Sequence, residues 1–315
     1  MRFTIAIPAF KLRFFEECLD SILAQSYQDF EILILNDASP EDFDSSIANY
    51  NDKRIQYFKN EKNCGALNVV DNWNKLLEMS KGDYVVMMGD DDKLHPDFLS
   101  SLNSLINKYP QVDVFHARVL GIDEKSSPNY LALERVEYES PCTFILERFR
   151  RGTQFIGDFC IRRNKLLEIG GYAKYPLAWC SDDVTSFSAC IPNGVVHTKE
   201  PLFYYRSSNI TISSSKFNKE KLEAVLKERK WFEQFVENYK PENEKEKLLF
   251  ELVKKEYPKH ISDKEALYFA RHLAEKKSNL FLFNKIRKHY HITSETTQKT
   301  AFMALGHILK SLFSK

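Results

Sequence analysis

Several familiar signatures are missing from this 315-residue sequence, and each absence narrows the class of protein. There is no GxxxxGK[ST] loop, which excludes a P-loop, and no GxGxxG follows the first apolar run, which disfavours a dinucleotide-binding fold. The six cysteines form no CxxC pair and show no metal-ligand spacing. This favours buried thiols over a disulfide framework or a zinc site. No apolar run reaches the roughly 18 residues of a membrane helix.

The sequence also lacks a strong excess of either charge, because its net charge is only +1. Nothing in this balance suggests binding to nucleic acid. The charge is uneven, however: residues 1–215 carry about 23 basic and 30 acidic side chains, and residues 216–315 about 22 and 14. The opening apolar run is short, is broken by Pro8 and has no small-residue cleavage site, so we identify no secretory signal. We expect a cytoplasmic protein with an acidic front and a basic tail.

Apolar runs and helical periodicities alternate through the first third of the chain. The pattern predicts strands at residues 3–8, 30–35, 55–58, 84–88 and 112–117, and helices at residues 14–25, 66–79 and 97–108. This rhythm is typical of an α/β fold with a mostly parallel, doubly wound sheet flanked by helices.

The rest of the chain is less regular. Residues 118–160 indicate loops and a hairpin, residues 166–171 and 183–189 helices, and residues 194–206 one or two strands. From residue 216 the pattern is helical, with faces rich in Lys and Glu. We therefore expect a sheet domain at 1–215, with halves at 1–117 and 118–215, and a helical C-terminal region at 216–315.

Three consecutive carboxylates, Asp90, Asp91 and Asp92, follow the predicted strand at 84–88. Adjacent carboxylates repel one another unless a cation or hydrogen bonds offset their charge. Mg²⁺ and Mn²⁺ favour oxygen ligands, often one or two carboxylates plus phosphate oxygens. The run predicts a metal site at the end of a strand. The alternative is a solvated acidic turn that caps the following helix.

A second acidic pair, Asp182 and Asp183, follows Trp179. A carboxylate beside an aromatic wall is a reasonable general base. A helix N-cap is the alternative. His197, in an apparent strand, is a candidate neighbour of the metal or a structural residue. Arg206 is a candidate contact for phosphate.

Five stretches, in order, give the chain a recognisable resemblance. They are FTIAIPAF, CLDSILAQSYQDFEILILNDAS, NCGALNVVDNWNKLLEMSKGDYVVMMGDDDKLHPDFL, CIRRNKLLEIGGY, and SDD followed by EPLFYYR. Together they resemble the family 2 glycosyltransferases of the GT-A fold over roughly residues 2–206. The resemblance implies an inverting sugar transfer, with a Mn²⁺ or Mg²⁺ cofactor, in bacterial surface polysaccharide or glycan synthesis. It also implies a nucleotide-diphosphate sugar donor, a UDP-sugar foremost, and a glycan or lipid-linked acceptor.

The resemblance also assigns roles to matching positions. The residues that it implies for donor binding lie at four places. They are Pro8, Ala9 and Phe10 at the nucleobase, Asp37 in a hydrogen bond to the base, Asn63, Gly65 and Asn72 near the nucleotide, and Asp90 at the ribose. Asp91, with Asp90, is the implied metal ligand, and His197 is a further candidate. Asp183 is the implied catalytic base, with Asp182 its neighbour.

The sequence departs from the family pattern at several points. Lys11 replaces the usual Asn or Glu after the first strand, and Gly89 replaces the first Asp of the common DxDD motif. The second change leaves open whether Asp90 is a direct ligand. No Gln-x-x-Arg-Trp follows Asp183 and no membrane helix is present, which argues against a processive synthase.

Two other functions stay open. A sugar nucleotidyltransferase also combines an α/β sheet, carboxylates and a metal, although it would normally carry a Gly- and Lys/Arg-rich loop after the first strand. A catalytically inactive nucleotide-sugar-binding module is the second alternative.

Two segments carry expectations of their own. Residues 207–216 suggest a lid over the site or a linker. Residues 301–313 have an apolar face beside basic residues, which predicts either contact with an anionic membrane surface or docking on the catalytic domain or a second subunit.

Overall fold

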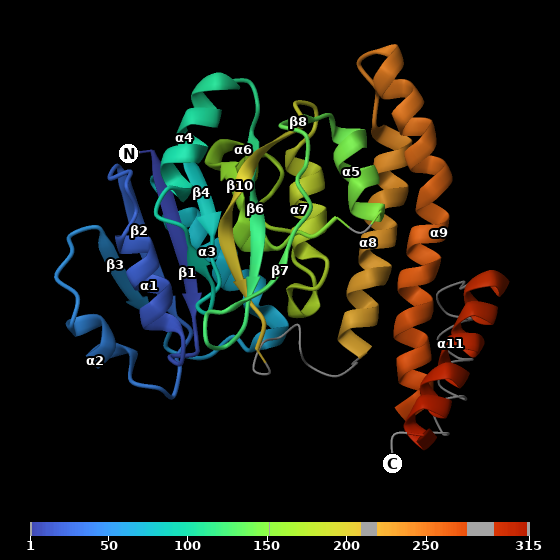
Figure 1. Ribbon diagram of the computed structural model, residues 1–315, viewed down its shortest axis with the longest axis horizontal. Coiled ribbons are helices and arrows are strands. Elements are labelled where there is room, and N and C mark those ends of the chain that lie inside the picture. The colour runs from blue at the N-terminus through green and yellow to red at the C-terminus, as the bar shows by residue number, and fades with distance from the viewer. Residues whose placement is uncertain (1, 151, 209–218, 276–292, 314–315) are drawn as a thin grey trace. The chain divides into compact units, whose positions relative to one another are not determined.

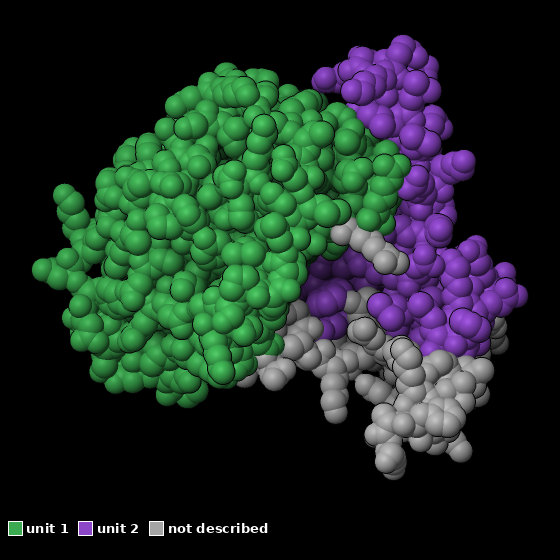
Figure 2. All heavy atoms as spheres, in the orientation of Figure 1, with its two compact units in different colours: residues 1–174, 181–214 green, residues 175–180, 215–315 purple. Residues whose placement is uncertain are grey.

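A computed structural model describes residues 2–150, 152–208, 219–275 and 293–313 (Figure 1). The chain forms two compact units, coloured separately in Figure 2. The sheet unit contains residues 1–174 and 181–214, and the helical unit contains residues 175–180 and 215–315. Residues 175–180 thus group with the C-terminal helices. The boundary that we expected at residue 216 assigned them to the sheet domain.

The sheet unit is built on one mixed sheet. Its strands are β1 (Phe3–Ala9), β2 (Phe30–Asn36), β3 (Ile55–Lys59), β4 (Tyr84–Met87), β5 (Lys93–Leu94), β6 (Val114–Ile122), β7 (Pro128–Leu131), β8 (Tyr138–Glu139), β9 (Phe159–Arg162) and β10 (Val195–Arg206). The main order is β3-β2-β1-β4-β9-β6-β10-β5, while β7 pairs with β6 and β8 with β10. β3, β2, β1 and β4 are parallel to their neighbours in this group, as are β6 and β10.

Helices flank this sheet (Figure 1). They are α1 (Phe15–Leu23), α2 (Phe43–Ala48), α3 (Val69–Met79), α4 (Phe98–Lys108), α5 (Pro141–Phe149), α6 (Arg163–Glu168) and α7 (Ser181–Ala189), with the short 3₁₀ turns η1 (Ala66–Asn68) and η2 (Ile156–Asp158). The predicted strands and helices of the first third are all present, within a few residues at each end. The predicted α/β class is therefore confirmed.

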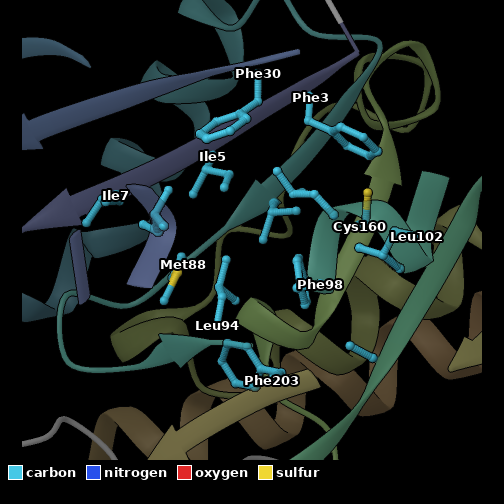
Figure 3. Packing of buried hydrophobic residues seen from close by; sticks show 14 of the residues in the cluster. Phe3, Ile5, Ile7, Phe30, Met88, Leu94, Phe98, Leu102, Cys160 and Phe203 are labelled. Carbon is cyan, nitrogen blue, oxygen red and sulfur yellow. The ribbon is translucent and has the colours of Figure 1, made fainter. Parts of the chain in front are cut away.

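The central strands are apolar on both faces because helices and neighbouring segments cover both sides. The β1 residues Phe3, Ile5 and Ile7 are fully buried. Figure 3 shows how the side chains of this cluster pack together. The labelled members are Phe3, Ile5, Ile7, Phe30, Met88, Leu94, Phe98, Leu102, Cys160 and Phe203. This core holds the strand ends that carry the polar residues of the site.

Residues 118–160 hold more structure than the sequence pattern predicts. The expected hairpin is present as β6 and β7. The helix α5 was missed, although Ser140 caps it by accepting a hydrogen bond from the amide of Thr143, and Pro141 occupies its first turn. The strand β9 was also missed. It lies antiparallel between β4 and β6, so the two expected halves of this unit share one sheet.

The helical unit contains α8 (Lys219–Asn238), α9 (Glu244–Glu275) and α11 (Ser294–Phe313), together with the 3₁₀ turn η3 (Pro176–Ala178). Partly buried ion pairs join α8 to α9, with Arg229 Nη1 3.0 Å from Glu265 Oε1 and Lys264 Nζ 2.7 Å from Glu228 Oε2. Among the described helices, none is both long enough and apolar enough to cross a membrane.

The two segment predictions fall largely outside the described residues. Residues 209–216 of the expected lid and the side chains of 305–313 in the expected amphipathic helix belong to that remainder. On α11, Phe302 is described and is 81% exposed.

Candidate functional site

Polar groups gather where β1, β2 and β4 end, at the carboxyl edge of the parallel strands. The Asp37 amide donates to the carbonyl of Ala9 at 2.9 Å, and the Ser39 hydroxyl donates to the carbonyl of Phe10 at 2.7 Å. The amides of Phe10 and Lys11 both donate to Asp90 Oδ2, at 2.7 and 2.8 Å. The fold thus brings the predicted residues Pro8 to Phe10, Asp37 and Asp90 to one edge, which is where open α/β sheets bind ligands.

Asp37 is the centre of a buried hydrogen-bond network. Its Oδ1 accepts from Asn60 Nδ2 at 2.8 Å and from the Cys64 amide at 3.0 Å, while its carbonyl accepts from Asn63 Nδ2 at 2.9 Å. Asn60 also donates to Asn72 Oδ1 at 2.9 Å. Burial raises the pKa of Asp37, but these hydrogen bonds outweigh it and the net pKa is lowered.

Gly65 directly precedes the 3₁₀ turn η1 and has a φ of 78°, a left-handed conformation that favours glycine. Of the predicted nucleotide-side residues, Asn63 and Asn72 belong to the Asp37 network, and Gly65 directly follows Cys64, whose amide donates to Asp37.

The three aspartates after β4 have different tasks. Asp90 holds the backbone of residues 10 and 11, and Asp92 Oδ1 accepts from the Arg206 amide at 2.9 Å. Among the residues that the structure describes, none besides Asp91 itself donates a hydrogen bond to the Asp91 carboxylate. A Cβ on Gly89 would lie 3.0 Å from Asp92 Oδ2 and 3.1 Å from Asp91 Oδ1. Glycine at this position therefore leaves room for the two carboxylates.

The environment makes negative charge costly at this turn. Burial, followed by the charge of Asp90, raises the pKa of Asp91 to about 6. Burial and the charge of Asp91 raise the pKa of Asp92 well above its ordinary value, and burial also raises that of Asp90. A bound cation would relieve this cost.

The described residues contain no cluster of three or more His, Cys, Asp or Glu side chains that could hold a metal ion by themselves. The donor set nevertheless fits Mg²⁺ or Mn²⁺ that is completed by phosphate oxygens and water, because such sites need only one or two carboxylates. Asp91 is the carboxylate best placed for this role, with Asp90 or Asp92 beside it.

Arg206 stabilises the aspartate turn through hydrogen bonds to Asp91 and Asp92. Its side chain is fully buried, with Nε 2.7 Å from the Asp91 carbonyl, Nη1 3.1 Å from the Asp123 carbonyl and Nη2 3.0 Å from Glu17 Oε2. The guanidinium also lies 4.3 Å from the centre of the Phe14 ring. Each of the three guanidinium nitrogens has a protein acceptor in this buried position, so the structure gives Arg206 a supporting role at the turn instead of the predicted contact with phosphate.

Asp183 lies in the first turn of α7 and is only 2% exposed. Arg148 Nε and Nη2 contact its two oxygens at 2.6 and 3.1 Å, and Gln154 Nε2 donates to Oδ1 at 2.7 Å. Asp182, next to it, is half-buried. The pair lies at the second and third positions of α7, inside the helix and not at its N-cap, and two side chains hold the Asp183 carboxylate.

The structure does not bring His197 to the aspartate turn. Its Nδ1 is 3.0 Å from His116 Nδ1, and its Nε2 is 3.4 Å from Glu139 Oε2. Both of its ring nitrogens thus face partners from β6 and β8, and its side chain is 1% exposed. His197 is therefore a buried strand residue and we do not retain it as a metal ligand.

Sequence analysis missed the residues that hold the predicted ones in place, namely Asn60, Cys64, Arg148 and Gln154. Asn60 carried a usable signal, because it directly follows β3 and so reaches the same sheet edge as Asp37. Arg148 and Gln154 carried none, since their contact with Asp183 spans about thirty residues and depends on how α5 packs beside α7.

Two curated relatives resemble part of this chain in sequence. Over 110 residues the chain is 31% identical to the GalNAc(5)-diNAcBac-PP-undecaprenol beta-1,3-glucosyltransferase of Campylobacter jejuni, covering 34% of this chain and 35% of that protein. It is 29% identical over 129 residues to an uncharacterized glycosyltransferase of Rickettsia typhi, covering 40% and 39%. These alignments span well under half of the curated relatives.

Solved structures share the fold. Staphylococcus aureus TarS 1–349 in complex with UDP-GlcNAc aligns over 96% of this chain and 79% of its own, with a TM-score of 0.64 at 14% identity. The mannosyltransferase PcManGT of Pyrobaculum calidifontis, in complex with GDP-Man and Mn²⁺, aligns over 100% and 88%, with a TM-score of 0.54 at 15% identity.

A family model matches more than half of the chain. It covers residues 4–175, which include β1, the Asp37 network and the aspartate turn. The expected GT-A-like fold and the expected resemblance are thus confirmed, and the chain belongs to glycosyl transferase family 2.

Proposed function

We propose that this chain is an inverting, metal-dependent glycosyltransferase that moves a sugar from a nucleotide-diphosphate sugar to an acceptor hydroxyl. The observation that carries the proposal is the aspartate turn after β4. Two of its carboxylates are committed to the backbone of the site, while Asp91, with a pKa raised to about 6, is left to meet a cation.

The donor side follows from the edge of β1, β2 and β4. Phe10 is 40% exposed next to the buried Ala9 and offers an apolar surface for a nucleobase. The Asp37 network fixes the adjoining wall. UDP-GlcNAc in the TarS structure and GDP-Man in PcManGT support a nucleotide sugar as donor, and we propose a UDP-sugar for this chain.

Departure of the nucleotide leaves negative charge on a diphosphate. Asp91, with Asp90 as its neighbour, would hold Mn²⁺ or Mg²⁺, which when bound supplies a Lewis acid that offsets this charge. The protein itself holds the groups of the site in position. Asp90 accepts hydrogen bonds from the amides of residues 10 and 11, and Arg206 donates one to the carbonyl of Asp91. A site held in this way needs little reorganisation as charge develops.

The acceptor side needs a base, because a hydroxyl is a poor nucleophile. We assign this role to Asp183. Arg148 and Gln154 hold its carboxylate in a fixed orientation, from which it would accept the proton of the attacking hydroxyl. Attack opposite the leaving diphosphate in a single displacement inverts the anomeric centre. Asp182, less buried and one residue earlier, is the alternative base.

For the acceptor we propose a glycan, carried on a lipid in the synthesis of a bacterial surface polysaccharide. The support is the Campylobacter relative, whose name describes a glucosyltransferase acting on an undecaprenol-linked glycan.

A donor panel tests the proposed function. UDP- and GDP-sugars are incubated with the protein and Mn²⁺, and the released products are identified. Release of a nucleoside diphosphate supports a glycosyltransferase, and release of pyrophosphate in the presence of a nucleoside triphosphate and a sugar phosphate supports a nucleotidyltransferase. Donor binding without turnover, with every acceptor class supplied, would contradict the proposal and favour an inactive module.

A further inference from the structure

A cavity of about 420 Å³ lies in the sheet unit, apart from the aspartate turn. Its floor includes His116 and His197, near the starts of β6 and β10, whereas the aspartate turn adjoins Arg206 at the other end of β10. The volume is within the range of about 300–1,000 Å³ that small-molecule sites occupy. The proposed function gives this cavity no task.

The walls of the cavity carry three Arg–Glu ion pairs. Arg118 Nη1 is 3.7 Å from Glu134 Oε2, Arg150 Nη1 is 3.1 Å from Glu147 Oε1, and Arg135 contacts Glu139 through two nitrogens. All six residues line the cavity. Their charges cancel, and each pair sets hydrogen-bond donors beside acceptors.

This pattern selects against charged ligands. An anion would compete with a glutamate for its arginine, and a cation would compete with an arginine for its glutamate. Separation is costly for the buried pair Arg135–Glu139, whose side chains are 12% and 3% exposed, and costs less for the more exposed pairs Arg118–Glu134 and Arg150–Glu147. A hydroxyl group both donates and accepts, so it can bridge a guanidinium and a carboxylate without breaking the pair. Threonines at 143, 153 and 198 add further hydroxyl partners. The walls therefore suit a neutral, polyhydroxylated ligand.

The floor is compatible with a neutral ligand. His197 is 1% exposed, and burial lowers its pKa to about 3, so its ring is uncharged at neutral pH. Its neighbour His116 is 3% exposed and lies 3.4 Å from Asp158 through Nε2.

One rim of the cavity is apolar and open to solvent. Leu133 is 88% exposed and Val136 is 65% exposed, and both line the cavity beside the ion pairs. An apolar side chain at the edge of a polar cavity can pack against the C–H face of a pyranose ring, while the walls meet its hydroxyls.

The wall of the cavity continues to the proposed base. Gly152 and Thr153 line the cavity, and the next residue, Gln154, donates to Asp183. Arg148 joins the same two places, since Nη1 donates to the Gly152 carbonyl at 2.9 Å and Nε contacts Asp183. Residues that line the cavity are thus adjacent in sequence, or hydrogen-bonded, to Gln154 and Arg148, the two residues that hold Asp183.

We propose that this cavity binds a neutral saccharide unit of the acceptor, with Leu133 packed against the sugar ring and the three Arg–Glu pairs bonded to its hydroxyls. The inference deepens the proposed function and rests on it, because only that function makes the bound saccharide an acceptor. The affinity of the cavity for saccharides can be measured without turnover.

The experiment compares the full-length wild type with Leu133→Asp, which places a charge on the apolar rim, and with Leu131→Asp. Leu131 is 51% exposed, lies two residues away and does not line the cavity, so it is the matched control. Saturation-transfer NMR measures binding of methyl glycosides of glucose, galactose, mannose and N-acetylglucosamine, with glucuronic acid and glucosamine as charged comparators. Thermal melting checks that each variant is folded.

We expect neutral glycosides to bind wild type and Leu131→Asp alike, and Leu133→Asp about tenfold more weakly, the lower end of what one apolar contact contributes to discrimination. Equal binding to all three proteins, preference for a charged sugar, or no binding by any glycoside would overturn the inference. Donor turnover is read separately by nucleoside diphosphate release. Absence of donor turnover in wild type would overturn the proposed function. The NMR binding measurement would still test whether the cavity binds neutral saccharides.

Discussion

The contact between Arg148 and Asp183 leads to a quantitative prediction. The Asp183 side chain is 3% exposed and that of Arg148 26%, and both carboxylate oxygens are engaged. Replacing Arg148 with Met keeps much of the apolar stem but removes the charge that compensates a buried anion. Breaking a buried pair in this way costs about 3–5 kcal/mol. We expect about 3 kcal/mol for Arg148→Met, because Arg148 is partly exposed and Gln154 still donates to Asp183.

The assay is urea unfolding at neutral pH of four proteins: wild type, Arg148→Met, Asp183→Asn and the double variant. If the loss comes from an uncompensated charge, the double variant should be more stable than Arg148→Met alone, because Asn cannot ionise. The coupling energy from this double-mutant cycle should exceed about 1 kcal/mol. Arg150→Met is the matched control: this arginine is 52% exposed and pairs with Glu147, so its loss should cost less than about 1 kcal/mol.

Two results would refute the reasoning. The first is a loss below about 1 kcal/mol for Arg148→Met. The second is a double variant in which the two single losses simply add. Either would mean that the ion pair does not stabilise the Asp183 anion, and its use in orienting the proposed base would have to be abandoned.

Three further predictions concern the carboxylates of the site. Asp183→Asn should lower kcat by about 10²–10⁴ with donor affinity near that of wild type; a larger effect of Asp182→Asn would reverse the assignment of the base. Asp91→Asn should lower kcat about a hundredfold or more and remove the rise in melting temperature that Mn²⁺ produces in wild type, so full activity in excess chelator would disprove the metal role. Asp37→Asn should cost about 1–2 kcal/mol at pH 7, measured by urea unfolding, because it replaces a charged acceptor of several hydrogen bonds. Since the folded pKa of Asp37 is lowered, its contribution is present above the unfolded value of 3.8 and lost as the pH falls through the folded pKa; wild type and variant should converge there, and a constant difference down to pH 2.5 would contradict this.

The sequence by itself determined the sheet edge of this protein. Strands β1, β2 and β4 are short and apolar, and the residues that follow them are polar. Because parallel strands end at a common edge, the residues Phe10, Asp37 and Asp90 had to lie near one another once the strands were identified. Local periodicity was sufficient for this sheet edge, and the five motifs in order were sufficient for the family resemblance.

Only the tertiary structure decided how the carboxylates differ. Asp90, Asp91 and Asp92 look alike in the sequence, yet Asp90 accepts from backbone amides, Asp92 accepts from the Arg206 amide, and burial with the charge of Asp90 raises the pKa of Asp91 to about 6. These partners lie about 80 to 115 residues away along the chain, so no local pattern reports them. The same holds for Arg148 beside Asp183, and for His197, whose ring contacts His116 and Glu139. Burial and charge compensation are properties of packed neighbours, and these exist only once β9, α5 and β10 are assembled.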